Sequence, residues 1–252
     1  MILAASLRKE LMEQVRTNRL LILAVVLLAF GLMSPLLAKY TPEILRLVPG
    51  AEEFAHLIPP PTMLDAVSQY VKNINQFGIL LVLLLTMGAV AQEKEKGTAA
   101  MMLVKPVTRG MFLLSKFFAI SLVFLAGMVL AGLGAYYYTV ILFTAPDFGA
   151  WMALTAMIWL QFLVYVALTL LFSTLVRSQA AAAGLGFGVV ILFSILGGLP
   201  GLGKYLPGHL VNWGASLFTP TPAPSWPALW VSLGIILASL TCALLVFERQ
   251  EL

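Results

Sequence analysis

Six long runs of mainly apolar residues are spaced along the 252-residue chain. A helix needs about 20 such residues to cross the hydrocarbon core of a bilayer, and each run approaches or exceeds that length. Only 10% of the residues are charged and 61% are hydrophobic, whereas a soluble domain carries about 25% charged residues. The sequence therefore predicts an all-α, multi-pass membrane protein, a single membrane domain over residues 1–252 with spans at 20–38, 77–91, 111–143, 151–176, 180–199 and 226–247.

Two of these runs depart in length from a simple span. The run at 77–91 is short, and we expect residues 71–76 to lengthen it, with their polar groups facing protein or the interface. The run at 111–143 is long enough to include an interfacial turn around Lys116.

The N-terminal stretch has the pattern of a surface helix. Within 1–19, apolar residues recur every four positions from Leu3 to Val15, and charged residues fall on the other faces. This spacing is typical of an amphipathic helix that lies in the membrane interface. No small-residue cleavage site follows, so we expect 20–38 to be a retained span.

The lysines and arginines are distributed unevenly between the two sides. An even number of spans places both termini on one side. With that side cytoplasmic, the inner segments hold eleven Lys or Arg residues and the outer segments hold four. This asymmetry follows the positive-inside rule. We therefore expect a plasma (inner) membrane protein whose termini and 92–110 loop face the cytoplasm.

Two external segments connect the spans on the other side. The segment 39–76 contains several prolines and predicts a loop followed by a short helix at 63–73. The segment 200–225 is too polar and too broken to span. Its apolar stretch at 206–218 is suited to re-enter the membrane where protein covers its backbone.

Residue sets for enzymatic chemistry are missing from the sequence. Cys242 is the single cysteine, and His56 and His209 are isolated, so we expect no catalytic residue, no metal site and no cofactor bound by this chain. Residues 198–204 have the glycine–lysine spacing of a phosphate loop, but they lack its Ser or Thr and its preceding strand. The basic residues form no stripe with interleaved aromatic residues, which excludes nucleic acid as the expected partner.

Two patterns inside the spans allow two interpretations each. Gln161, Tyr165 and Thr169 recur every four residues and share one helix face, where they either line a substrate path or bond to neighbouring helices. Gly184 and Gly188 let another backbone approach, from this chain or from a second copy. The spans contain no acidic residue. Ion-coupled transport is therefore disfavoured, and the energy source must lie elsewhere.

The loop 92–110 combines charges, a glycine and a short helical patch. Gly97 interrupts the preceding helix, Thr98 can cap a short helix over 99–104, and Pro106 ends it. An adaptable apolar surface on that helix is formed by Met101, Met102 and Leu103. The pattern fits docking into a groove on a partner, or a loop that lies on the membrane.

The segment EKEKGTAAMMLVKPVTRGMFLLSK resembles the E-[RK]-E-x-G-T-x-x-x-L-x-x-P-[VI]-[ST]-R segment, followed by a lysine, of ABC-2-type permeases. These are the membrane subunits of type V ATP-binding-cassette exporters. The matching residues are Glu93, Glu95, Gly97, Thr98, Leu103, Pro106, Val107, Thr108, Arg109 and Lys116. The amphipathic N-terminal stretch, six spans and broken external segment before the last span also resemble the family in outline.

The resemblance implies that the loop is a cytoplasmic coupling helix between helices 2 and 3. It would dock on a separately encoded ATPase, present in two copies, that binds ATP and magnesium. Glu93 and Glu95 would lie at the junction with the ATPase, and Arg109 would steady the loop. The residues expected to couple are Glu93, Glu95, Gly97, Thr98, Met101, Met102, Leu103, Pro106 and Arg109.

The function implied is that of a permease subunit of an ATP-driven exporter. Two permease copies, identical or paralogous, would form the substrate pathway between them and would contact membrane lipids. The segment 206–218 would be the re-entrant element that closes this pathway on the outside. The alternative is a non-transporting scaffold or assembly factor that transmits ATPase-driven work to an extracytoplasmic partner.

Overall fold

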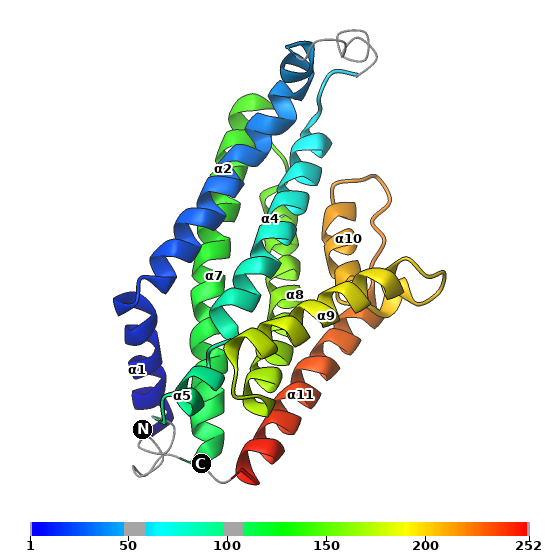
Figure 1. The fold of residues 1–252 in the computed structure, drawn as a ribbon. Helices are drawn as coiled ribbons and strands as arrows, with labels where there is room; N and C mark the ends of the chain where they lie inside the picture. The colour runs from blue at the N-terminus through cyan, green and yellow to red at the C-terminus, as the bar shows by residue number, and fades with distance from the viewer. Residues whose placement is uncertain (1, 48–58, 98–107, 251–252) are drawn as a thin grey trace.

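The computed structural model describes residues 2–47, 59–97 and 108–250, and within these ranges the chain is all-helical with no strand. Six helical segments are long and apolar enough to cross a membrane. Figure 1 shows the helices α1 (Ile2–Arg16), α2 (Arg19–Arg46), α4 (Met63–Thr86), α5 (Ala91–Glu95), α7 (Arg109–Leu142), α8 (Phe148–Leu175), α9 (Gln179–Gly197), the 3-10 turn η1 (Gly203–Tyr205), α10 (Gly208–Ser216) and α11 (Trp226–Glu248).

The first two spans extend farther toward the segment that connects them than the sequence predicts. α2 continues to Arg46. Residues 39–46, which were predicted to be loop, are therefore helical. The short helix predicted at 63–73 and the second span form one helix, α4. Its start is fixed by Asp65, whose carboxylate accepts hydrogen bonds from the Thr62 backbone nitrogen at 2.7 Å and the Thr62 hydroxyl at 2.8 Å.

Two other boundaries also differ from the prediction. The second span does not continue as a helix to residue 91; α4 ends at Thr86, and α5 begins at Ala91 after a turn. The interfacial turn predicted around Lys116 is wrong, because α7 is a continuous helix through that residue. The turn after Thr86 arises from a tertiary contact, because backbone groups of the turn bond to Ser173 of α8.

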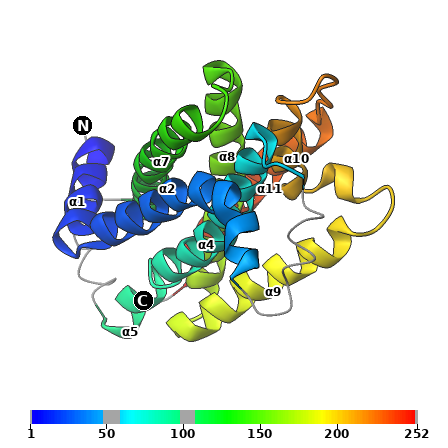
Figure 2. The ribbon, with the colours of Figure 1, turned by 90° about the horizontal axis from the view of Figure 1, so that it is seen from above.

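The core of the bundle is built around α8. This helix contacts α4, α7, α9, α10 and α11, and Figure 2 shows it behind and between these elements. Trp151 near its start is fully buried, and its indole nitrogen donates a hydrogen bond to the Gly132 carbonyl of α7 at 2.9 Å. The Trp151 ring packs against Tyr70 of α4, with centroids 5.2 Å apart. One aromatic side chain thus joins three of the spans.

α2 and α7 pack side by side along most of their length (Figure 1). The close approach depends on Gly31, because a Cβ added there would lie 2.6 Å from the Ala131 carbonyl oxygen. A second close contact brings Leu23 of α2 onto Gly127 of α7. Small residues let the two backbones meet without leaving space between them.

α9 lies at the edge of the bundle (Figure 2). Only Ala182 and Gly186 among its residues are buried. Its outer face exposes large apolar side chains, including Phe187 at 55% and Ile195 at 62%. This helix is the least covered of the long helices in the described part of the chain.

α10 packs against the sides of the long helices. Its buried residues are Leu210, Val211 and Gly214, and a Cβ added at Gly214 would lie 2.7 Å from Leu154 Cδ1 of α8. Figure 1 shows α10 beside α8 and α4 rather than beyond their ends. The segment 206–218 is therefore mainly a short helix with one face packed against the bundle, and its re-entry into the membrane stays a prediction.

Replacing Gly31 with valine should separate α2 from α7. Overpacking of this kind costs about 1–3 kcal/mol, so we expect Gly31→Val to lower the melting temperature in detergent by several degrees. The control is Gly234→Val in α11, where an added Cβ meets no described atom within 4 Å. Equal melting temperatures for the two variants would contradict the packing described.

Candidate functional site

The turn between α4 and α5 is held by a serine of α8. The Ser173 hydroxyl accepts hydrogen bonds from the backbone nitrogens of Val90 at 3.0 Å and Ala91 at 2.9 Å, and it donates to the Met87 carbonyl at 2.8 Å. Buried backbone groups that leave a helix need such partners. Ser173 therefore explains why the chain can break here, and it positions the residues of α5 that follow.

Lys116 of α7 lies between carboxylates from two other helices. Its Nζ is 2.6 Å from Oε1 of Glu93 in α5 and 3.0 Å from Oε2 of Glu10 in α1. The side chains of Lys116 and Glu10 are each 4% exposed, and that of Glu93 is 15% exposed. Lysine and glutamate are rarely buried unless paired. The two ion pairs therefore account for a buried lysine in an otherwise apolar helix.

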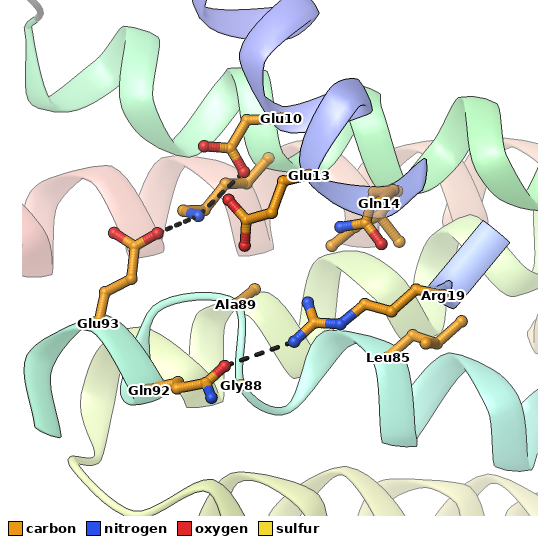
Figure 3. Close-up of a pocket in the computed structure, with 11 residues that line it drawn as sticks. Glu10, Glu13, Gln14, Arg19, Leu85, Gly88, Ala89, Gln92 and Glu93 are labelled. Carbon is orange, nitrogen blue, oxygen red and sulfur yellow. Dashed lines mark hydrogen bonds and ion pairs between the residues drawn. The ribbon is translucent and has the colours of Figure 1, made fainter. Parts of the chain in front are cut away.

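A small pocket adjoins these ion pairs (Figure 3). Arg19 at the start of α2 donates a hydrogen bond to Gln92 Oε1 at 3.4 Å, closing the side opposite Lys116. The enclosed space is about 20 Å³, enough for about one water molecule. We call the charged and amide side chains here the polar cluster; its members are Glu10, Glu13, Gln14, Arg19, Gln92, Glu93 and Lys116.

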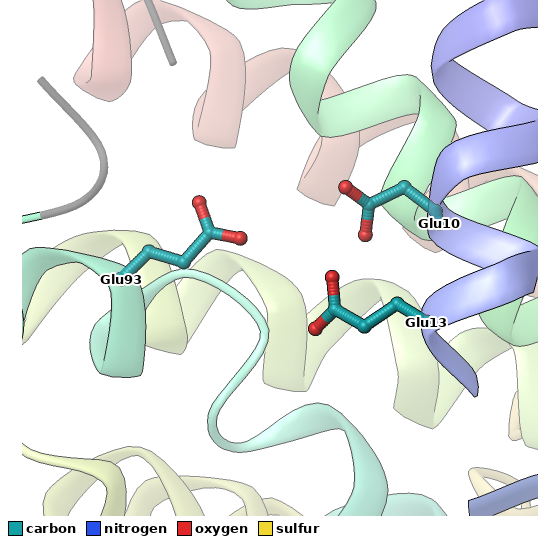
Figure 4. A group of neighbouring side chains, drawn as sticks. All are labelled: Glu10, Glu13 and Glu93. Carbon is teal, nitrogen blue, oxygen red and sulfur yellow. The ribbon is translucent and has the colours of Figure 1, made fainter. Parts of the chain in front are cut away.

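Three carboxylates meet in this cluster (Figure 4). Oxygen atoms of Glu10, Glu13 and Glu93 all lie within 4.8 Å of one another. Such a group could hold a cation, but the Lys116 ammonium already bonds two of its members. Lys9 also lies 3.2 Å from Glu10. Lys9, Lys116 and Arg19 carry three formal positive charges, and the three glutamates carry three negative ones. The chain's own side chains therefore balance the charge.

Two cationic side chains, one in α5 and one at the start of α7, bond to the C-terminal ends of two other helices. Arg109 Nη1 donates hydrogen bonds to the carbonyls of Phe247, Glu248 and Gln250, at 2.6, 2.8 and 2.9 Å. Lys94 donates to the Thr174 carbonyl at the end of α8. The last carbonyls of a helix lack intrahelical partners and carry partial negative charge, so cations stabilise them. α5 is thereby tied to α8, and the start of α7 is tied to α11.

The structure describes only part of the predicted coupling segment. Glu93 is in the polar cluster, and Arg109 caps α11. Glu95 is exposed at the end of α5, and Gly97 has φ +68°, a conformation that favours glycine. The remaining coupling residues lie outside the described ranges: Thr98, Met101, Met102, Leu103 and Pro106.

The three polar residues predicted to share a face of α8 have two surroundings. Gln161 and Tyr165 line a pocket formed with α4, α9 and α10. Thr169 is fully buried and lies against Gly186 of α9, where an added Cβ would be 3.0 Å from its hydroxyl oxygen. Its hydroxyl oxygen has no hydrogen-bond partner among the described residues, and its role stays a prediction. The role of the other two remains a proposal.

The two glycines singled out in α9 do not pack within the described chain. A Cβ added at Gly184 or Gly188 meets no described atom within 4 Å. The glycine of α9 that does allow close packing is Gly186, where a Cβ would lie 2.7 Å from Leu83 of α4. The approach of a second copy to Gly184 and Gly188 stays a prediction.

The sequence alone does not predict the ion pair between Lys116 and Glu10 in the polar cluster. Lys116 was interpreted as marking an interfacial turn, and Glu10 was not singled out. The available signal was a lone cation inside a long apolar helix, because such a group needs a partner. Glu10 and Glu13 are three residues apart and therefore share a face of α1.

Removing the ammonium group from the polar cluster should destabilise the protein strongly. Breaking a buried pair costs about 3–5 kcal/mol because the remaining charge is uncompensated, so we expect that loss for Lys116→Met. Adding Glu10→Gln and Glu93→Gln should restore part of it. The measurement is unfolding by sodium dodecyl sulfate in mixed micelles.

The matched control for this prediction is Lys72→Met, at an exposed position of α4. Surface substitutions of this kind usually change stability by less than about 0.5 kcal/mol. If Lys116→Met behaved like this control, the ion pairs would contribute nothing measurable to the fold.

Comparison with known proteins agrees with this architecture. Residues 4–252 match the family model described as ABC-2 family transporter protein. The chain is also 31% identical, over 218 residues, to the uncharacterized transmembrane protein YxlG of Bacillus subtilis (strain 168), covering 83% of this chain and 82% of the relative. The match spans the N-terminal helix, all six candidate spans and the polar cluster, and the chain therefore belongs to the ABC-2 family of transporter membrane proteins.

Proposed function

We propose that this chain is the permease subunit of an ATP-driven exporter, coupled through residues 92–110 to a separate ATPase that binds ATP and magnesium. The observation that carries the proposal is the anchoring of this segment at both described ends. On one side, Glu93 and Lys94 bond to α7 and α8. On the other side, Arg109 bonds to the end of α11.

This anchoring supports transmission of movement from the loop to the spans. A push on the loop displaces α5, and the Glu93–Lys116–Glu10 ion pairs connect α5 with α7 and α1. Because α7 packs along α2, the displacement reaches that helix as well. Packed helices move by small sliding or rotation rather than by bending continuously. An ATPase that closes on ATP would in this way change the position of four helices.

The orientation of the chain in the membrane is inferred from the basic residues at the end of the bundle that carries the loop. Figure 1 shows α1, α5 and the last turn of α11 together at one end. The described basic residues of this end include Arg8, Lys9, Arg16, Lys94 and Arg109. The positive-inside rule makes this the cytoplasmic end, with α1 in the interface of the plasma (inner) membrane.

The exposed face of α9 supports a second permease copy as a partner. Gly184 and Gly188 leave its backbone uncovered, and large apolar side chains flank them. Small residues in a spanning helix allow a close approach by another helix. The second copy, identical or paralogous, would meet this face, and the substrate path would lie between the copies. α10 would close that path from the outer side.

The proposal is tested by purifying the chain with the products of its neighbouring genes. An ATPase should co-purify with the native chain in detergent. It should be lost when residues 99–104 are replaced by Gly and Ser, while membrane insertion is unchanged. If no nucleotide-binding protein associates with the native chain, the loop is a membrane-bound connection, and the scaffold alternative is favoured.

Changes at the exposed end of α5 should uncouple the two subunits without unfolding the permease. Glu95→Ala removes an exposed charge. Gly97→Pro requires φ near −65° in place of the observed +68°. We expect each variant to reduce the effect of the permease on the ATPase rate about tenfold, within the usual range of coupling free energies.

The measurement is ATP hydrolysis by the assembled complex in lipid nanodiscs. Lys72→Ala, at an exposed position of α4 outside the 92–110 segment, is the control and should leave the rate near that of the native complex. Native rates for Glu95→Ala and Gly97→Pro together would contradict the assignment of this segment to coupling.

A further inference from the structure

A second pocket, of about 240 Å³, lies among α4, α8, α9 and α10. It is separate from the polar cluster and shares no residue with it. Its lining comes from four different parts of the described chain, including η1 before α10. The residues that matter to its chemistry are Asn75, Ile79, Gln161, Tyr165, Phe193 and His209.

Three polar atoms in this pocket are buried without a hydrogen-bond partner among the described residues. They are Oδ1 of Asn75, Oε1 of Gln161 and Nδ1 of His209. Gln161 is only 2% exposed. A buried polar atom left unpaired costs about 1–3 kcal/mol by mutational measurement. Three such atoms, from α4, α8 and α10, border one space, which therefore favours a group that can hydrogen-bond to them.

The rest of the wall mixes apolar and aromatic side chains with the uncharged polar residues Ser194 and Asn212. The rings of Tyr165 and Phe193 lie 6.1 Å apart between centroids, and Ile79, Val190 and Leu206 add aliphatic surface. None of the lining residues, all of which are described, is Asp, Glu, Lys or Arg. A charged ligand would therefore find no opposite charge to offset its desolvation.

The size of the pocket distinguishes a ligand from a single buried water. One water needs about 10–15 Å³ of such space, and the pocket is far larger. Its shape depends on Gly203, because an added Cβ there would lie 2.6 Å from the Gly197 carbonyl at the end of α9. Gly208 also lines the pocket, and a Cβ added there meets no described atom within 4 Å.

We propose that this pocket binds a small uncharged molecule that joins a hydroxyl or amide hydrogen-bond donor to an aromatic or aliphatic group. The donor pairs with the orphaned oxygens of Asn75 and Gln161, and the apolar part lies against Tyr165 and Phe193. This binding site goes beyond the proposed transport role. It does not depend on coupling to an ATPase.

The test uses a cysteine at the exposed rim of the pocket in the full-length chain. In a Cys242→Ser background, Ser194→Cys supplies a single thiol on the pocket wall. Its rate of labelling by N-ethylmaleimide is measured in lipid nanodiscs with increasing 2-phenylethanol or with propylbenzene, which has a methyl group in place of the hydroxyl. We expect 2-phenylethanol to slow labelling in a saturable manner, and propylbenzene to do so only weakly.

Two variants and one control locate the effect. Gln161→Leu should weaken protection by 2-phenylethanol about threefold to tenfold, as the loss of one hydrogen bond does. Gly208→Leu should abolish protection by filling the space from α10, and it keeps the proposal testable if Gln161→Leu fails to fold. Ser232→Ala, which removes another buried hydroxyl without a partner but lies in α11 outside the pocket, should leave protection unchanged.

Equal protection by the two compounds would mean that the pocket accepts apolar molecules or lipid chains without using its polar atoms. No protection by either would mean that it holds only water or bound lipid. Both results would overturn the proposal. Neither would bear on whether the ATPase co-purifies, so failure here is distinguishable from failure of the transport assignment.

Discussion

Lys116 brings one ammonium group between carboxylates that belong to two other helices, and the packing of α1, α5 and α7 at their end of the bundle depends on it. Burying these charges is costly, and well-packed apolar residues could give similar stability. The ion pairs instead fix how the helices are placed. For the ammonium group to keep both partners, α1, α5 and α7 must meet in one register. Arg109 and Ser173 extend this fixed arrangement to α11 and α8.

The polar cluster and the pocket share one lining helix, α4, which contributes Leu85 to the first site and Asn75 and Ile79 to the second. α4 and α8 border the pocket at Asn75 and Gln161, and farther along the chain both approach the turn held by Ser173. A displacement of α5 would therefore act on helices that also form the pocket wall. α9 and α10 complete that wall, and α9 is largely exposed. The pocket thus joins a firmly packed side to a loosely packed one.

Hydropathy was sufficient to predict six spans, because length and apolar content alone decide whether a helix can cross a bilayer. It could not place the break after Thr86, since the backbone groups freed there are satisfied by Ser173, far away in sequence. It also could not show that Lys116 is buried, because its partner Glu10 precedes the first span. His209 was dismissed as isolated for the same reason: Asn75 and Gln161 come near it only in the folded chain.

The most direct test of the account is a distance measured across the polar cluster. Spin labels at Val15→Cys in α1 and Lys96→Cys beyond α5, both exposed positions, would report whether these elements move as one body in the assembled complex. The account predicts one narrow distance distribution, unchanged by ATP, and a broad distribution when Lys116→Met is added. A distance that changes with ATP in the native cluster, or a distribution that Lys116→Met leaves narrow, would contradict it.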